Sequence, residues 1–351
     1  MNVQTASSPV YFENKRLMSW CRWLRESMLS RVFVLADEHT AQHCLPIFTA
    51  ATSTQVTIHP IIVPAGEHSK SLESAIYIWK QLLSGHATRN DCLVNLGGGM
   101  ITDLGGFAAS LYKRGMRFVH FPTSLLAQVD AAIGGKTGID FGNLKNMIGT
   151  WSKPDAIFIL PAFLDTLDER QIRNGWAEMM KHALIADKDY WKEVKHFELS
   201  KLASFIHQSV KIKQEIVGQD PLENNLRKVL NFGHTVGHAL EAYFLKRGND
   251  EVLHGEAVAA GMICESWIAT RCCGLSLDQY TDIANAIDAV YTRLTFPDSA
   301  IPELIDFMIL DKKNANREIR MALIKSIGEP LPQVSVSMDL IVDSLRSYLN
   351  K

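Results

Sequence analysis

The segment that most constrains the fold begins at residues 91–96, which read as a short buried strand. It runs directly into Gly97, Gly98 and Gly99, and a helix-like stretch follows. A strand, a glycine-rich turn and a helix N-terminus present bare backbone N–H groups and the helix dipole to an anion such as phosphate. Thr102 stands where the dinucleotide-binding fingerprint G-x-G-x-x-G has its third glycine. A simple tight turn therefore stays an alternative. The position after a strand, with Asp103 expected in the first helical turn, favours a nucleotide pyrophosphate.

The first half of the chain alternates strand and helix patterns. Strands are expected at residues 31–36, 55–63, 91–96 and 117–121, with a helix at 71–83. This alternation predicts a parallel sheet covered by helices, in which ligands gather at the carboxyl ends of the strands. Asp37, Glu67, the glycine turn and Thr123 all follow strand ends or their turns.

Beyond about residue 168 the strand patterns fade and long helical patterns take over. They cover residues 169–185, 199–217, 228–245, 255–272 and 277–290. We therefore expect an α/β, Rossmann-like nucleotide-binding domain at residues 1–167 and an all-α metal- and substrate-binding domain at residues 168–351.

Three histidines cluster in the helical half. His234 and His238 are four residues apart and share one face of a helix, and His254 follows shortly. Imidazole is a common metal ligand, so the cluster favours an open, catalytic metal site over half-buried histidines on a packed helix. A zinc-protease motif would need a Glu directly after the first histidine, where this chain has Thr235.

Composition narrows the choice of partners. At 351 residues, with 47% hydrophobic and 21% charged residues, the chain is long enough for two globular domains. A net charge of −2 offers no basic field for nucleic acid or an anionic membrane. The sequence has no run of eighteen apolar residues and no secretory signal, and its six cysteines form no C-x-x-C pair. These features predict a cytoplasmic protein that acts on a small molecule.

Several long motifs follow one another along the chain, at residues 97–107 (GGGMITDLGGF), 121–130 (FPTSLLAQVD), 133–138 (IGGKTG), 145–149 (KNMIG), 177–181 (AEMMK), 231–238 (NFGHTVGH), 254–256 (HGE) and 311–313 (DKK). In these motifs and their order, the chain resembles the 3-dehydroquinate synthase family of sugar phosphate cyclases from residue 37 to about residue 327. The resemblance implies an α/β domain related to glycerol dehydrogenase, bound NAD⁺, one Zn²⁺ or Co²⁺ ion per chain and a homodimer.

The resemblance also implies a reaction of the shikimate pathway, which leads to chorismate and the aromatic amino acids. 3-Deoxy-D-arabino-heptulosonate 7-phosphate would be oxidised by NAD⁺, lose phosphate, be reduced again, open its ring and close by an intramolecular aldol addition to 3-dehydroquinate. Hydride returns to the substrate in each turnover, so NAD⁺ would act as a catalyst in this carbon–oxygen lyase.

Residue roles follow from the same resemblance. The implied metal ligands are Glu178, His234 and His254, which removes His238 from the ligand set. The implied catalytic residues are Lys136, Lys181, Glu223 and His238. The implied substrate-binding residues are Arg114, Lys136, Asn146, Lys213, Arg227, Asn231, His238 and Lys312, with Lys313 as an alternative to Lys312. The implied NAD-binding residues are Asp37, Glu67, Lys70, Gly98, Gly99, Asp103, Thr123, Ser124, Asp130, Lys136, Lys145, Phe163 and Thr166.

Arg114 is expected to cross the dimer interface and contact the phosphate of the neighbouring subunit's substrate. The chain departs from the family's common pattern at His39, Ser124 and Gln171, and His39 affects the expected ribose contact. Another sugar phosphate cyclase, a polyol dehydrogenase of the glycerol dehydrogenase type and a non-catalytic binding module are the alternatives. Lys213, Arg227 and Asn231 together favour a carboxylate-bearing substrate over the first of these.

Overall fold

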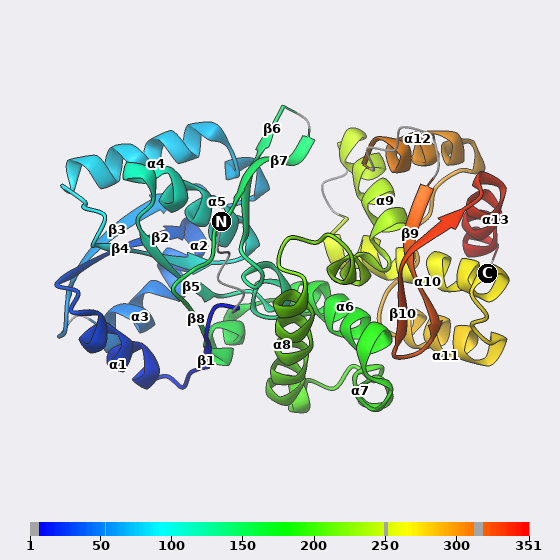
Figure 1. Cartoon of the computed structure of the whole chain (residues 1–351), viewed down its shortest axis with the longest axis horizontal. Coiled ribbons are helices and arrows are strands. Elements are labelled where there is room, and N and C mark those ends of the chain that lie inside the picture. The colour runs from blue at the N-terminus through cyan, green and yellow to red at the C-terminus, as the bar shows by residue number, and fades with distance from the viewer. Residues whose placement is uncertain (1–6, 53, 143, 249–251, 312–318, 351) are drawn as a thin grey trace. The chain divides into compact units, whose positions relative to one another are not determined.

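The computed structural model describes residues 7–52, 54–142, 144–248, 252–311 and 319–350 (Figure 1). The chain divides into two compact units, Met1–Ile172 and Arg173–Lys351. The division falls in the first turn of α6 (Glu169–Ala186), shortly after the expected boundary at residue 167. Each unit is described by itself.

Unit 1 is built on a six-stranded sheet in which every strand pair is parallel. The strands follow the order β1 (Val10–Phe12), β8 (Ala156–Ile159), β5 (Arg117–Pro122), β4 (Cys92–Gly97), β2 (Arg31–Asp37) and β3 (Thr57–Val63). The four strands expected from the sequence are confirmed, whereas β1 and β8 were not predicted. The glycine turn therefore leaves an interior strand, β4.

Helices cover both faces of this sheet, as Figure 1 shows. Phe33 and Leu35 face α4 (Leu72–Ser84) and α5 (Gly99–Leu111), while Val32 and Val34 face α1 (Met18–Ser27) and α3 (Leu45–Thr52). Successive side chains of a strand point to opposite faces of the sheet. Because helices bury both faces, nearly every residue of these strands is apolar, as in the sequence. The short helix α2 (Glu38–His43) follows β2.

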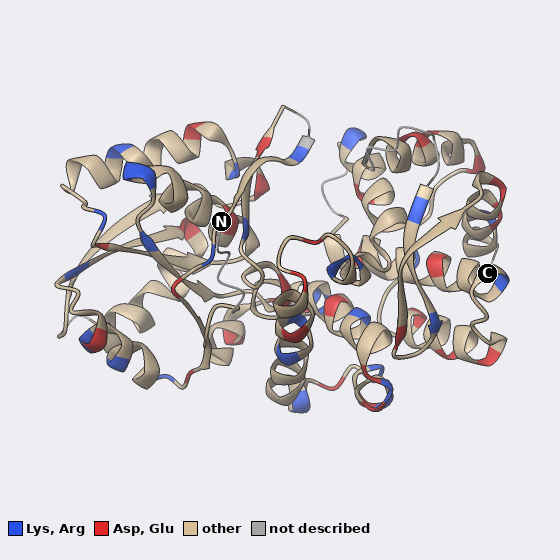
Figure 2. Ribbon diagram, in the orientation of Figure 1, with Lys and Arg blue, Asp and Glu red and all other residues tan. Residues whose placement is uncertain are grey.

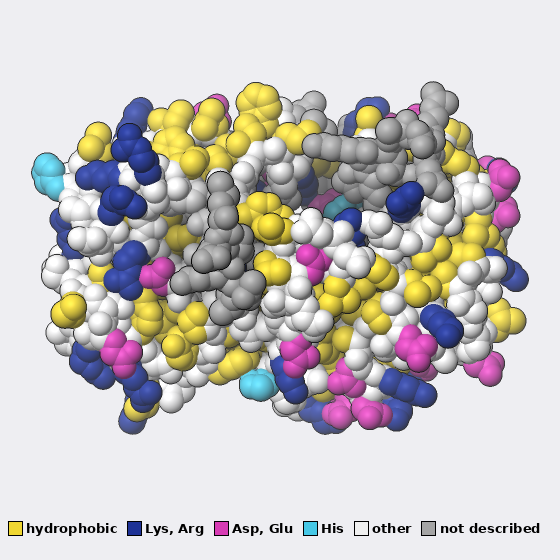
Figure 3. Space-filling view, in the orientation of Figure 1, with side chains coloured by type: hydrophobic (Ala, Val, Ile, Leu, Met, Phe, Trp, Pro, Cys, Tyr) yellow, Lys and Arg dark blue, Asp and Glu magenta, His cyan; other side chains and the backbone are white. Residues whose placement is uncertain are grey.

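An antiparallel hairpin of β6 (Lys136–Phe141) and β7 (Leu144–Trp151) packs against α5 and was not predicted. Phe141, Met147 and Trp151 are exposed on it, and hydrophobic side chains show at the surface there (Figure 3). The remaining short segments of unit 1 are η1 (Glu67–Ser69), η2 (Tyr112–Arg114), η3 (Ala127–Ala131) and η4 (Pro161–Thr166).

Unit 2 is organised around α10 (His254–Cys272), which is buried along most of its length and packs against α9, α11, α13 and β9. The other helices are α7 (Lys188–Val194), α8 (Leu202–Gln219), α9 (His234–Lys246), α11 (Leu277–Asp288), α12 (Ile301–Asp311) and α13 (Met338–Leu349), with short segments η5 (Leu199–Lys201), η6 (Leu226–Asn231) and η7 (Asp298–Ala300). The helical class is confirmed. The sequence expectation omitted one antiparallel hairpin, β9 (Ile319–Ser326) and β10 (Glu329–Val336).

The helix expected at residues 228–245 is interrupted. The 3₁₀ segment η6 ends at Asn231, and α9 begins only at His234. Gly233 between them has φ +80°, a left-handed conformation that costs glycine little. The interruption makes His234 the first residue of a helix instead of an interior one.

Charges of both signs are distributed over both units (Figure 2). Among the described residues, no helix is long and apolar enough to cross a membrane.

Candidate functional site

Unit 2 brings the three expected metal ligands together. Glu178 comes from α6, while His234 and His254 are the first residues of α9 and α10. Glu178 Oε1 lies 3.5 Å from His234 Nε2 and 3.6 Å from His254 Nε2. The Glu178 side chain is completely buried, and so is its neighbour Lys181 on the next turn. Both side chains therefore face the interior of unit 2.

Each imidazole is oriented by a contact at its other nitrogen. His234 Nδ1 lies 3.1 Å from the carbonyl oxygen of Phe232, and His254 Nδ1 lies 3.3 Å from Glu241 Oε2. An N–H at Nδ1 satisfies these acceptors and leaves Nε2 of each ring facing Glu178. Such support from outside the ligand set is the usual arrangement of metal-binding histidines. Sequence reasoning missed Glu241, and its position one turn after His238 on α9 was the available signal.

The ligand spacing fits a small divalent cation. Two ligand atoms in tetrahedral coordination, with bonds of about 2.1 Å, are separated by about 3.4 Å. Glu178 lies close to this spacing from both His234 and His254, and the three residues supply one carboxylate and two imidazoles. A second set joins His238, Glu241 and His254. The His234 and His238 rings lie side by side, with their centroids 5.1 Å apart.

The two ligand histidines differ in charge. Burial lowers the pKa of His234 well below its usual value, and the nearby Lys181 charge lowers it further. Burial also opposes a charge on His254, but hydrogen bonds to Glu178 and Glu241 outweigh it and raise the pKa of His254 to about 10. At neutral pH these shifts favour a neutral ring at His234 and a protonated ring at His254, and a metal ion bound at His254 would replace that proton.

Three of the expected catalytic or substrate-binding cations of unit 2 are buried. Lys181, Lys213 and Arg227 are 1%, 5% and 3% exposed. Lys181 contacts the Glu178 carboxylate, as expected for a buried cation. Arg227 also donates to the carbonyl oxygen of Pro221 at 2.7 Å. Asn231 Nδ2 donates to Glu223 Oε1 at 2.9 Å, which brings together two further expected site residues.

In unit 1, the glycine turn forms the N-terminus of α5. Gly98 is the N-cap residue and has no side chain to occupy the first-turn N–H groups, and a Cβ there would lie 3.3 Å from Ser124 Oγ. This bare, closely approached helix start fits a pyrophosphate. The sequence suggested that Asp103 lies in the first helical turn, and this was wrong. Because α5 begins at Gly99, Asp103 lies in the second turn. Instead, Asp103 Oδ2 accepts a hydrogen bond from Lys70 Nζ at 2.6 Å.

Lys70 links expected nucleotide- and substrate-binding residues. Its Nζ also donates to Asn146 Oδ1, and Glu67 Oε1 lies 3.9 Å away. Burial opposes the charge on Lys70, but the Asp103 and Glu67 carboxylates outweigh it and raise the Lys70 pKa. These four residues form one polar cluster within unit 1.

The other expected nucleotide-binding residues of unit 1 are more dispersed. Asp37 caps α2 by accepting from Thr40 N at 2.8 Å. Phe163 is only 2% exposed within the core, so a nucleotide contact there would come from its backbone. The remainder occupy the ends of strands, the η segments and the β6–β7 hairpin: Thr123, Ser124, Asp130, Lys136, Lys145 and Thr166.

Three expected site residues have left-handed backbones. Arg114, Asn146 and Glu223 have φ values of +64°, +53° and +59°. Non-glycine residues seldom adopt this region, and such strain concentrates at functional sites. Lys312 and its alternative Lys313 lie outside the described residues.

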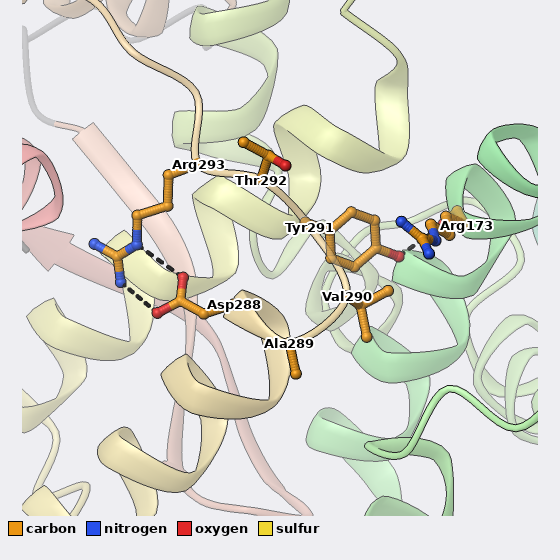
Figure 4. Close-up of a pocket in the computed structure, with 7 residues that line it drawn as sticks. All are labelled: Arg173, Asp288, Ala289, Val290, Tyr291, Thr292 and Arg293. Atoms are coloured by element: carbon orange, nitrogen blue, oxygen red, sulfur yellow. Dashed lines mark hydrogen bonds and ion pairs between the residues drawn. The ribbon is translucent and has the colours of Figure 1, made fainter.

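Unit 2 also contains a pocket of about 450 Å³ that does not include the ligand set (Figure 4). Arg293 and Asp288 form a two-bond ion pair along its wall, at 2.8 and 2.9 Å. Tyr291 donates to the carbonyl oxygen of Arg173 at 2.7 Å. The Arg293 guanidinium therefore has a carboxylate partner, and we assign this pocket no role.

Two family matches together cover most of the chain. Residues 60–174 match the 3-dehydroquinate synthase N-terminal family, and residues 175–314 match the 3-dehydroquinate synthase C-terminal family. A 3-dehydroquinate synthase of Parabacteroides distasonis is 42% identical over 325 residues, which is 91% of this chain and 91% of that protein.

Solved structures agree on the fold. A 2-epi-5-epi-valiolone synthase from Streptomyces hygroscopicus, with NAD⁺ and Zn²⁺ bound, superposes with a TM-score of 0.87 at 25% identity, covering 100% of this chain and 99% of that chain. A 2-deoxy-scyllo-inosose synthase in complex with carbaglucose-6-phosphate, NAD⁺ and Co²⁺ gives 0.85 at 22% identity, with 96% of each chain covered. A glycerol dehydrogenase from Schizosaccharomyces pombe gives 0.69 at 12% identity, covering 98% and 90%, which confirms the expected relationship of folds.

Proposed function

The chain belongs to the 3-dehydroquinate synthase family, and we propose that it converts 3-deoxy-D-arabino-heptulosonate 7-phosphate to 3-dehydroquinate and phosphate. NAD⁺ and one divalent ion, Zn²⁺ or Co²⁺, would assist this carbon–oxygen lyase reaction. The observation that carries the proposal is the ligand set of Glu178, His234 and His254 beside the buried Lys181. A non-catalytic binding module would have no need to bury a carboxylate, two imidazoles and a lysine together.

The metal would be held by Glu178 and by the Nε2 atoms of His234 and His254. When bound, it would lower the pKa of a coordinated substrate hydroxyl and so favour its oxidation. Lys181 contacts the Glu178 carboxylate and supports its ionised form. Glu241 and the Phe232 carbonyl hold the rings, so little reorientation is needed when the ligands engage.

The substrate's carboxylate and phosphate need cationic partners, and unit 2 supplies them. Lys213 and Arg227 are buried where few waters compete for their N–H groups, which strengthens charge-assisted hydrogen bonds. Asn231 orients the Glu223 carboxylate, which in its ionised form can accept a proton at Oε2. His238 lies beside His234 and His254, and it would exchange a proton with the substrate near the leaving phosphate.

Unit 1 would bind NAD⁺, with the pyrophosphate at the α5 N-terminus. Gly98 and Gly99 leave the backbone accessible, and the Lys70–Asp103 pair fixes side chains close to it. NAD⁺ would supply the hydride acceptor and then return the hydride, so it is not consumed. Lys136, on the hairpin after the glycine pair 134–135, would contribute a cation.

The decisive experiment incubates purified protein with the heptulosonate phosphate, Zn²⁺ or Co²⁺ and a sub-stoichiometric amount of NAD⁺. We expect phosphate and 3-dehydroquinate in equal amounts over many turnovers, without growing NADH absorbance. Stoichiometric NADH would identify a polyol dehydrogenase. Turnover of sedoheptulose 7-phosphate alone would identify another sugar phosphate cyclase. Absence of all turnover and metal binding would leave only a binding module.

We also infer a cytoplasmic homodimer in which Arg114 acts on the neighbouring subunit's substrate phosphate. A charge-assisted phosphate contact contributes about 1.5–3 kcal/mol, so Arg114→Ala should lower kcat/KM roughly ten- to a hundred-fold. Mixing Arg114→Ala subunits with metal-deficient His254→Ala subunits should partly restore activity, because one site of the mixed dimer keeps both functions. Mixed dimers that form but stay inactive would contradict action across the interface.

A further inference from the structure

The helix that carries His234 begins without a capping side chain of its own. Its N-cap residue is Gly233, and α9 follows immediately. The missing cap is supplied by Glu265, a completely buried residue of α10. Glu265 Oε2 accepts from Gly233 N at 2.6 Å, and Oε1 accepts from Val236 N at 3.0 Å. One carboxylate thereby satisfies two amides on either side of His234, and its charge favours the positive end of the helix dipole.

The backbones of α9 and α10 are in close contact at this joint. Gly261 precedes Glu265 by one turn, so both lie on the same face of α10. A Cβ on Gly261 would lie 1.9 Å from the carbonyl oxygen of Gly233, and one on Gly233 would lie 2.6 Å from Met262 Cγ. The first turn of α9 cannot move toward α10 without a clash. The Glu265 hydrogen bonds oppose movement in the other direction.

A second buried side chain makes the equivalent contact at the other histidine. Asn174 Oδ1 accepts from Gly255 N at 2.7 Å, directly after His254 at the start of α10. Asn174 and Glu178 are four residues apart on α6 and share a face. Thus α6 holds α10 through Asn174, and α10 holds α9 through Glu265. The three ligand-bearing helices are joined in series, α6 to α10 and α10 to α9, by buried hydrogen bonds that end within two residues of each histidine.

We propose that Glu265 is a positioning residue of the metal centre, which fixes the backbone of His234 and thereby sets the affinity for the divalent ion. This inference rests on the ligand set proposed above. Burying a carboxylate is costly unless its hydrogen bonds compensate, and a neutral Ser or Asn could cap an ordinary helix from its own chain position. The buried charge instead links the start of α9 to α10. His234 Nε2 extends directly from that turn, so a small displacement of the turn moves the ligand atom.

The test measures Co²⁺ affinity and the visible absorption of bound Co²⁺ in metal-free protein. Glu265→Gln keeps the side chain's size but turns an NH₂ group toward one of the two amides. Glu265→Asp keeps the charge but is too short to reach both amides. The matched control is Ser276→Ala, which removes the ordinary side-chain cap of α11, where Ser276 Oγ accepts from Gln279 N at 3.2 Å.

We expect both Glu265 variants to raise the Co²⁺ Kd by roughly ten- to a hundred-fold and to alter the Co²⁺ spectrum. Ser276→Ala should lower Tm with an unchanged Kd and spectrum. If Glu265→Gln does not fold, Glu265→Asp decides the question. A folded Glu265 variant with wild-type affinity and spectrum overturns the inference. Wild-type protein that binds no Co²⁺ would refute the ligand set itself, which is a separate failure.

Discussion

Metal binding to this protein should release a proton from His254. Hydrogen bonds to Glu178 and Glu241 outweigh burial and raise the pKa of His254 to about 10. At pH 7 the ring is therefore protonated, and a metal ion has to displace that proton from Nε2. A difference of about three pH units weakens apparent metal binding by up to about a thousand-fold, or about 4 kcal/mol.

The sign of the pH dependence follows directly. Below the pKa of His254, each unit rise in pH lowers the competition between the proton and the metal ion tenfold. The apparent affinity for the metal ion should therefore rise about tenfold per pH unit between pH 6 and pH 8. His234 should add nothing to this slope, because its pKa is already lowered by burial and by Lys181. Calorimetric titrations of metal-free protein in two buffers with different ionisation enthalpies would count the protons released.

The control is Glu241→Gln, which removes one of the two carboxylates that stabilise the charged ring. The pKa of His254 should fall, so its proton should compete less with the metal ion at pH 7.5, and the rise of affinity with pH should level off at a lower pH than in the wild type. This comparison separates the His254 proton from one lost by metal-bound water. Equal affinity at pH 6 and pH 8 without proton release in the wild type would refute the reasoning.

Three further outcomes are expected. Lys70→Met should weaken NAD⁺ binding about tenfold, measured by fluorescence titration, because it leaves Asp103 without the 2.6 Å contact; unchanged affinity would place the nucleotide elsewhere. Asp91→Asn should lower the free energy of unfolding by about 1.5–3 kcal/mol at pH 7. Burial opposes ionisation of Asp91, but the hydrogen bond from Arg31 helps to lower the Asp91 pKa in the folded protein. The stabilisation by Asp91 is therefore present above pH 4 and is lost as the pH falls through its pKa in the folded state. An Asp91→Asn variant that loses the same unfolding free energy in urea at pH 3 and at pH 7 would contradict this. Gly233→Ala should destabilise unit 2 by about 1–3 kcal/mol in thermal unfolding, because φ is +80° and the added Cβ meets α10; an unchanged Tm would show that the joint can relax.

Some of the fold could be predicted because its signals are local. The strands at β2, β3, β4 and β5 are short apolar runs ended by turn residues, and each was found. The β6–β7 hairpin was missed because its strands mix charged, glycine and exposed apolar residues, and only pairing with each other and packing on α5 makes them regular. The β9–β10 hairpin was missed for a related reason. Its register shifts break the alternation that would reveal β10.

The metal centre shows where sequence information ends. Spacing along the chain grouped His234, His238 and His254, but Glu178 joined the site only through resemblance, since helix packing decides which turns meet. The residues that orient the ligands are harder still to find: Glu265 stands inside a long apolar run, where the pattern alone shows only a misplaced charge. A buried carboxylate needs partners that retain its charge, and here they are two amides of another helix. An isolated charge in an otherwise apolar helix is therefore a reason to look for an uncapped helix start nearby, and in this chain that start carries a metal ligand.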